Sequence, residues 1–79
     1  MPRLTLYHKP SCPYCQRVFS FMRTKNITLP LKDVVSDPKN YEELIKIGGT
    51  GQVPCLVIDG KALYESDDII AWLEKNWKK

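Results

Sequence analysis

The spacing of apolar residues along the chain predicts four β-strands. Alternate residues of a strand point to opposite faces of a sheet, so an apolar residue at every second position indicates one buried face. Leu4 and Leu6 follow this pattern in the first segment. Pro30 lies in the second segment and places it at a sheet edge, because proline has no N–H for the ladder. The four strand segments are 3–8, 27–33, 53–58 and 61–64.

Three further segments have the spacing of an amphipathic helix, in which residues three and four apart share a face. The first helix is expected to begin near Pro13 and the last to have Ser66 as its N-cap. Their apolar stripes are Cys15, Val18, Phe19 and Met22 in the first, and Ile69, Ile70, Trp72, Leu73 and Trp77 in the last.

The middle helix is expected from about Pro38 to Ile47. Asp37 is a suitable N-cap, and Pro38 fits the first helical position, where its missing N–H has no partner to lose. Gly48-Gly49 is expected to end the helix. The residues expected on its buried side are Tyr41, Leu44, Ile45 and Ile47.

The predicted order is therefore strand, helix, strand, helix, strand, strand, helix. The first strand–helix–strand unit is expected to be right-handed with parallel strands. Asp59-Gly60 is a two-residue hairpin signal, which makes the last two strands antiparallel. The sequence thus predicts an α/β fold with a four-stranded mixed sheet flanked by three helices. At 79 residues, we expect one domain that spans 1–79.

Composition and charge narrow the function. The net charge is +3, and the lysines are scattered without a basic stripe, so we expect no nucleic-acid partner. The chain has no run of about 18–20 apolar residues and no signal peptide, so we expect a cytoplasmic protein without a membrane partner. The predicted elements leave no spare apolar stripe that a second copy of the chain could cover, so we expect a monomer. Three cysteines are an odd number and do not suit a disulfide framework.

Cys12 and Cys15 carry the strongest chemical signal. Cys12 falls at the start of the first predicted helix, where free N–H groups and the helix dipole favour an anion. The pKa of its thiol is therefore expected to be lowered, and Lys9 adds positive charge nearby. Cys15 lies one turn inside the helix and is less exposed. Cys12 would attack a disulfide, and Cys15 would resolve the resulting mixed disulfide.

A zinc site and a purely structural pair are the alternatives for these cysteines. Zinc prefers four ligands, and the chain offers only Cys12, Cys15, Cys55 and His8 as soft candidates. A cysteine pair at a strand-to-helix junction favours redox chemistry, so we expect no metal. Cys55 is assigned to the core, and His8 to packing at the end of its strand.

The chain resembles the glutaredoxin family, which has a thioredoxin-like fold. Cys12-Pro13-Tyr14-Cys15 matches the dithiol active site of that family, and Gln52-Val53-Pro54 matches the segment that contains its cis-proline. Asp67 and Asp68 match the end of a third glutaredoxin motif. The preceding Glu65-Ser66 instead resembles the N-terminal domains of glutathione transferases. The resemblance covers essentially the whole chain.

This resemblance implies a glutathione site. The backbone of Val53, directed by a cis bond to Pro54, would pair with the cysteinyl backbone of the tripeptide. Lys9 and Gln52 would hold its glycyl carboxylate. Its γ-glutamyl end would lie against Ser66 and Asp67, with Glu65 as the transferase-like element. Tyr14 would lie beside the sulfur.

The resemblance also implies an enzyme, a glutathione-disulfide oxidoreductase with glutathione as co-substrate. Its other partners would be disulfide-bearing or glutathionylated proteins. Two alternatives stay open at this point. One is an electron donor that is reduced by a thioredoxin reductase, for example one that serves ribonucleotide reductase. The other is an iron–sulfur cluster carrier, which Pro13 disfavours because it stiffens the active-site turn.

Overall fold

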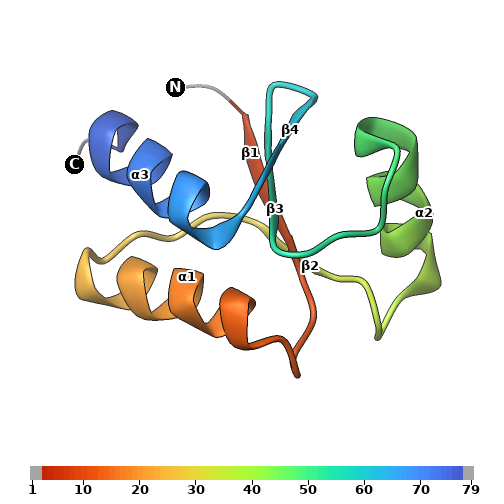
Figure 1. Cartoon of the computed structure of the whole chain (residues 1–79), viewed down its shortest axis with the longest axis horizontal. Coiled ribbons are helices and arrows are strands. Elements are labelled where there is room, and N and C mark those ends of the chain that lie inside the picture. Colours follow the sequence, from red (N-terminus) through yellow and green to blue (C-terminus); the bar gives the residue numbers. More distant parts are fainter. Residues whose placement is uncertain (1–2, 78–79) are drawn as a thin grey trace.

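The computed structural model describes residues 3–77 and has the predicted order of elements. Its four strands form one mixed sheet in the order β2-β1-β3-β4 (Figure 1). The elements are β1 (Leu4–His8), α1 (Pro13–Thr24), β2 (Leu31–Asp33), α2 (Pro38–Gly48), β3 (Cys55–Ile58), β4 (Lys61–Tyr64) and α3 (Ser66–Asn76). No helix within residues 3–77 has both the length and the apolar character needed to cross a membrane.

The parallel pair of β1 with β2 and the antiparallel pair of β3 with β4 are as the sequence predicts. Leu6 of β1 lies opposite Leu31 in the parallel pair with β2 and opposite Leu56 in the antiparallel pair with β3. The turn between β3 and β4 has positive φ angles of 50° at Asp59 and 84° at Gly60. Two such residues form the turn whose twist matches a hairpin, which confirms the prediction from these two residues.

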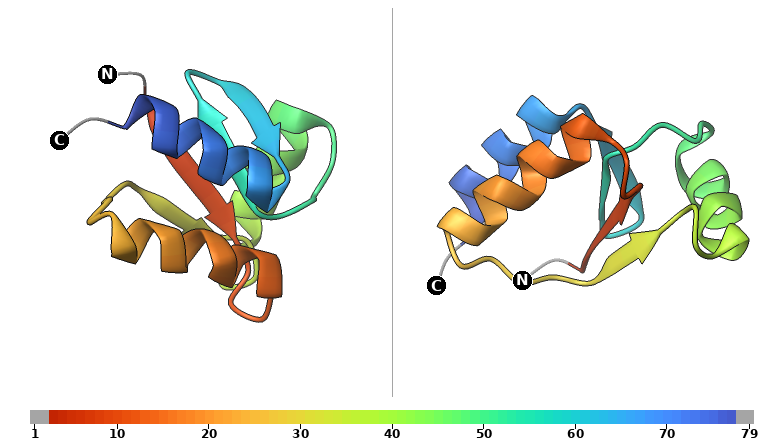
Figure 2. Two further views of the ribbon diagram at one scale, coloured as in Figure 1. Left: turned by 60° about the vertical axis from the view of Figure 1, so that its left-hand side comes forward. Right: turned by 90° about the horizontal axis from the view of Figure 1, so that it is seen from below.

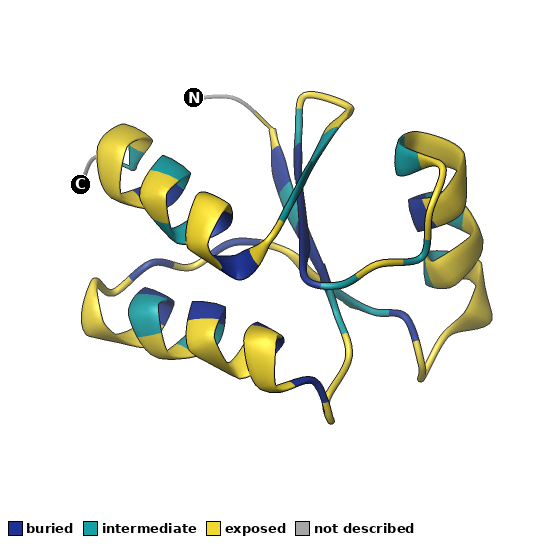
Figure 3. Ribbon diagram, in the orientation of Figure 1, coloured by how far each residue is buried: buried dark blue, intermediate teal, exposed yellow. Residues whose placement is uncertain are grey.

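The helices lie in two layers on opposite faces of the sheet. Helices α1 and α3 run side by side over one face, and α2 lies alone on the other (Figure 2). Buried residues therefore form two clusters, and the larger is enclosed by the sheet, α1 and α3 (Figure 3). The larger cluster contains Leu4, Leu6, Val18, Met22, Ile27, Leu29, Leu56, Ile69 and Leu73. The smaller contains Tyr7, Val34, Leu44, Cys55 and Val57.

Strand β2 is shorter than the sequence predicts. Only residues 31–33 pair in the sheet, whereas 27–33 showed strand alternation. Ile27 and Leu29 are buried in the larger cluster, but Leu31 is 48 % exposed. The alternation therefore reflects a segment that crosses the core before it joins the sheet edge. The expected start at residue 53 is also wrong for β3, because the turn at Val53-Pro54 precedes the strand.

Helix α2 buries only Leu44, so the expected burial of Tyr41, Ile45 and Ile47 is wrong. The helix touches the sheet along a narrow line and leaves these three side chains at the surface. Its ends are as predicted. The Asp37 carboxylate accepts a hydrogen bond from the Lys39 N–H at 3.0 Å, and a left-handed Gly49 follows the last turn.

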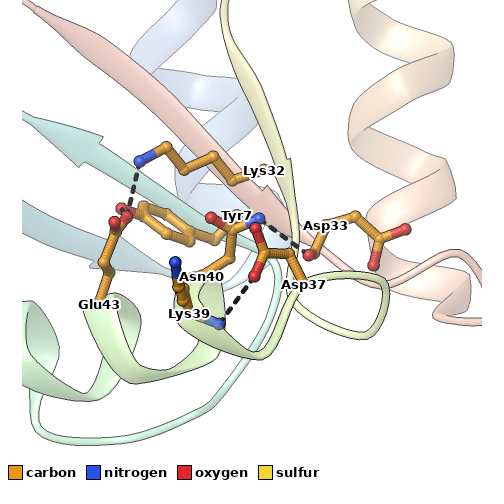
Figure 4. Close-up of polar contacts among 7 residues, drawn as sticks. All are labelled: Tyr7, Lys32, Asp33, Asp37, Lys39, Asn40 and Glu43. Atoms are coloured by element: carbon orange, nitrogen blue, oxygen red, sulfur yellow. Dashed lines mark hydrogen bonds and ion pairs between the residues drawn. The ribbon is translucent and has the colours of Figure 1, made fainter.

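Polar contacts attach α2 to the sheet (Figure 4). The Tyr7 hydroxyl donates to Glu43 Oε1 at 3.0 Å, and Lys32 Nζ donates to the same oxygen at 2.6 Å. Asn40 Nδ2 donates to the carbonyl of Asp33 at 3.0 Å. One helix is thereby linked to both β1 and β2, although it contributes a single buried side chain.

Helix α3 and its N-cap each lie one residue earlier than predicted, because Ser66 was expected as the N-cap. Ser66 is its first residue and is buried, and Glu65 occupies the N-cap position with φ 71° and no side-chain hydrogen bond to the helix. The positive φ turns the chain sharply from β4 into α3. As a result, the N–H groups at the start of α3 receive no cap from the Glu65 side chain.

Candidate active site

Cys12 is the N-cap of α1 and ends the loop that leaves β1. Its N–H donates to the carbonyl of Lys9 at 3.1 Å, and its carbonyl accepts from the N–H of Gln16 at 3.2 Å. Gln16 Nε2 also donates to the carbonyl of Pro10 at 3.3 Å, which ties the loop to the helix. Pro13 follows in the first turn, as predicted. These contacts hold the Cys12 sulfur at the positive end of α1.

The pKa of Cys12 is lowered from its ordinary value. Desolvation by burial would raise it, since Cys12 is only 9 % exposed. The opposing effects are larger in sum: hydrogen bonds from the N–H and the thiol of Cys15 and from the N–H of Tyr14, and the charge of Lys9. All of them stabilise a thiolate. Lys9 therefore acts on the site, although it lies outside the residues that line the adjoining hollow.

Cys15 has the opposite character. It is fully buried one turn into α1, and burial raises the pKa of its thiol to about 11. The Cys12 sulfur next to it also disfavours a second negative charge. The pair therefore consists of a Cys12 that ionises more readily than an ordinary cysteine and a Cys15 that stays protonated at neutral pH. The lowered pKa of Cys12 and the deeper burial of Cys15 agree with the expectations from the sequence.

A hollow of about 320 Å³ lies next to Cys12 and is lined by residues from three separate segments. They are Tyr14, Gln52, Val53, Pro54, Glu65 and Ser66, all of which belong to the predicted glutathione site. The Val53-Pro54 bond is cis, as the resemblance implied. The Cys12 thiol points to the carbonyl of Val53, with 3.9 Å between sulfur and oxygen.

Two acidic residues, Glu65 and Asp67, flank Ser66, which lines this hollow. Gln52 Nε2 donates to Glu65 Oε1 at 3.0 Å, which joins the loop before β3 to the start of α3. Asp67 follows Ser66 and is bound by Arg17 of α1, with 2.6 Å between Nη2 and Oδ1. The sequence analysis gave Arg17 no role and missed this contact. No local pattern pairs two residues that lie 50 positions apart.

Cys55 and His8 lie outside this arrangement. Cys55 is fully buried in the smaller cluster on the α2 side of the sheet, where burial raises the pKa of its thiol to about 11. The His8 ring packs edge-on against Phe19 at 5.0 Å. Both residues thus have the packing roles expected from the sequence. Within residues 3–77, no three His, Cys, Asp or Glu side chains are grouped so that they could hold a metal ion.

Comparison with known proteins places this chain in a family. The sequence profile of the glutathione S-transferase N-terminal domain matches residues 6–78. Glutaredoxin 3 of Escherichia coli (strain K12) is 30 % identical over 71 residues, which cover 90 % of this chain and 86 % of the relative. The chain belongs to the glutaredoxin family. Like other glutaredoxins, it has a thioredoxin-like fold, and the family consists of thiol–disulfide oxidoreductases.

Solved structures of glutathione transferases also superpose on this chain. Glutathione transferase Omega 3C from Trametes versicolor superposes with a TM-score of 0.78 at 33 % identity, covering 91 % of this chain and 32 % of the transferase. A glutathione S-transferase from Methylobacillus flagellatus, solved with glutathione bound, superposes with a TM-score of 0.76 at 25 % identity, covering 92 % of this chain and 36 % of that one. This chain therefore matches only about a third of the length of those enzymes.

Proposed function

We propose that this chain is a glutathione-dependent thiol–disulfide oxidoreductase that reduces protein disulfides and protein–glutathione mixed disulfides. The observation that carries the proposal is the unequal cysteine pair. Cys12 has a lowered pKa and lies beside the hollow, whereas Cys15 is buried with a raised pKa. A nucleophile that ionises readily and a neighbour that stays protonated are what two successive thiol exchanges need.

The first exchange frees the target protein. The Cys12 thiolate attacks the glutathione sulfur of a mixed disulfide, a Cys12–glutathione disulfide forms, and the protein leaves as a thiolate that takes a proton from solvent. A second glutathione thiolate then attacks the glutathione sulfur of that disulfide. Oxidised glutathione leaves, and the Cys12 thiolate is restored. One disulfide bond breaks and one forms in each step.

Protein disulfides use the second cysteine. Attack by Cys12 gives a mixed disulfide with the target and releases one target thiolate. Cys15 then loses its proton and attacks the Cys12 sulfur, so that the target is released with both thiols reduced. Two molecules of glutathione reduce the resulting Cys12–Cys15 disulfide. The hydrogen bond between the two thiol groups is consistent with the short reach that this step requires.

Glutathione is proposed to lie in the hollow beside Cys12. The backbone of Val53 would pair with the cysteinyl residue, and Tyr14 would flank the sulfur. Lys9 and Gln52 would hold the glycyl carboxylate. Glu65, Ser66 and Asp67 would receive the γ-glutamyl end. Glutathione bound to a transferase of similar fold supports this choice of ligand.

The test is a coupled assay with a glutathione mixed disulfide, glutathione and glutathione reductase. Cys12→Ser should abolish turnover, and Cys15→Ser should retain it on this substrate but lose reduction of protein disulfides. A parallel assay replaces the glutathione system with thioredoxin reductase. Turnover with thioredoxin reductase and none with glutathione would refute the proposed reductant. Full activity in both variants would refute the mechanism.

A further inference from the structure

The segment that joins α2 to β3 (Figure 1) supplies one wall of the hollow but is held by few polar contacts. The residues of this wall are Gln52, Val53 and Pro54. Within residues 3–77, residues 50–53 form no backbone–backbone hydrogen bond. The side chain of Gln52 is joined to Glu65 by a single hydrogen bond of 3.0 Å. The course of this backbone therefore depends on how side chains pack against it.

Tyr41 of α2 packs directly against Gly51 in this segment. A Cβ placed on Gly51 would lie 2.6 Å from the Tyr41 hydroxyl oxygen and 2.7 Å from its Cζ, and closer still to Cε1. Atoms that are not bonded to each other do not approach so closely. The φ angle of Gly51 lies outside the left-handed region, so the backbone conformation does not require a glycine here. The glycine is required by the tyrosine ring alone.

This contact is the only route by which Tyr41 can act on a ligand in the hollow. Tyr41 is 46 % exposed, so its ring contributes less to the core than a buried aromatic side chain would. The ring does not line the hollow. Gly51, however, directly precedes Gln52 and Val53, whose backbone forms part of the hollow. A ring that fixes Gly51 therefore also fixes the backbone that follows it.

We propose that Tyr41 and Gly51 position the Gln52-Val53 backbone for glutathione. The ring holds the segment in the conformation that receives the tripeptide, so less conformational entropy is lost when the ligand binds. Tyr41 does not touch glutathione and is a positioning residue that acts through Gly51. This inference rests on the proposed glutathione reaction.

The experiment measures two reactions of Cys12 in each variant. One is turnover of the mixed disulfide of glutathione with 2-mercaptoethanol, which uses the hollow. The other is alkylation by iodoacetamide, which requires only the thiolate. Tyr41→Ala should lower kcat/KM for the mixed disulfide about tenfold, mainly through KM, because ordering the backbone of one residue on binding has a cost of this size. The alkylation rate should stay at the wild-type value.

Gly51→Ala tests the same contact from the other side. Its Cβ would displace the Tyr41 ring, which can turn outward because it already lies partly in solvent. The loss in kcat/KM should therefore match that of Tyr41→Ala. The double variant should lose no more than the larger single effect, because the new Cβ then meets no ring.

Two further variants serve as controls. Tyr41→Phe keeps the ring and should retain most of the wild-type kcat/KM. Ile45→Ala removes another partly exposed apolar side chain of α2, one turn further along, and should keep the wild-type value. Thermal unfolding of every variant identifies a temperature at which all of them are folded, and both reactions are measured there.

Each outcome has a distinct meaning. An unchanged kcat/KM in Tyr41→Ala, an equal fall in its alkylation rate, or additive losses in the double variant would overturn the inference and leave the proposed function intact. A wild-type protein that does not turn over the glutathione mixed disulfide would instead overturn the proposed function itself.

Discussion

Cys12 should be the one cysteine that reacts with iodoacetamide in the folded protein, although the chain contains three. Alkylation requires the thiolate. Burial raises the pKa of both Cys15 and Cys55 to about 11, so roughly one molecule in 10,000 carries either thiolate at pH 7. The pKa of Cys12 lies below 9.0, so its thiolate is at least ~100-fold more abundant.

The expected result is one equivalent of label at pH 7 in the native protein and three after unfolding in denaturant. Mass spectrometry of tryptic peptides assigns the site. As pH falls through the pKa of Cys12, the labelling rate should fall with it, with a midpoint below 9.0. Comparable native labelling of Cys15 or Cys55 would refute the assignment of their protonation states.

A substitution tests the cause of the lowered pKa. Burial acts to raise the pKa of Cys12, and the Cys15 thiol is one of the donors that oppose it. Cys15→Ala removes that donor, while Cys15→Ser keeps a hydroxyl in its place. A hydrogen bond to a charged group contributes about 1.5 kcal/mol, so labelling of Cys12 at a pH below its pKa should slow about tenfold in Cys15→Ala. Equal rates in the two variants would show that this hydrogen bond does not lower the pKa.

Three further predictions concern the scaffold. Burial raises the pKa of Cys55 from 9.0 to about 11, so above pH 9 the unfolded chain loses a proton from Cys55 that the folded chain keeps. This group should lower the free energy of unfolding by up to ~2.7 kcal/mol between pH 9 and 11, so urea unfolding of Cys55→Ala should show a smaller fall than the wild type over this range. An equal fall in both proteins would contradict this prediction. Leu44→Ala should lower the free energy of unfolding by about 2–5 kcal/mol, and Ile45→Ala, at an exposed position, by less than ~1 kcal/mol. A larger loss in Ile45→Ala than in Leu44→Ala, measured by urea unfolding, would be inconsistent with the structure. Gly48→Ala should destabilise the protein by about 1–3 kcal/mol despite the better helix propensity of alanine, because its Cβ would meet the Tyr64 hydroxyl. In thermal unfolding, adding Tyr64→Phe should relieve part of this loss. A Gly48→Ala variant more stable than the wild type would show that the contact is absent.

The sequence alone determined the features that depend on neighbours along the chain. The Asp37-Pro38 helix start and the Asp59-Gly60 hairpin follow from the conformations that these residues favour locally. The position of Cys12 at a helix start is of the same kind. It let us expect a lowered pKa and a nucleophilic role, because the N–H groups that stabilise its thiolate come from the next few residues.

Only the tertiary structure decided what depends on distant segments. Alternation in 27–33 indicates that Ile27 and Leu29 are buried, but it does not show whether their backbone pairs in the sheet. The predicted length of β2 was therefore too great. The apolar residues of the α2 segment could not show how little of that helix the sheet covers. The Arg17–Asp67 pair exists because packing of α1 against α3 brings together two residues with no common sequence pattern. The hollow beside Cys12 forms only where α1, the loop before β3 and the start of α3 meet. Local preferences act over a few residues, whereas contacts across the fold depend on how whole elements pack.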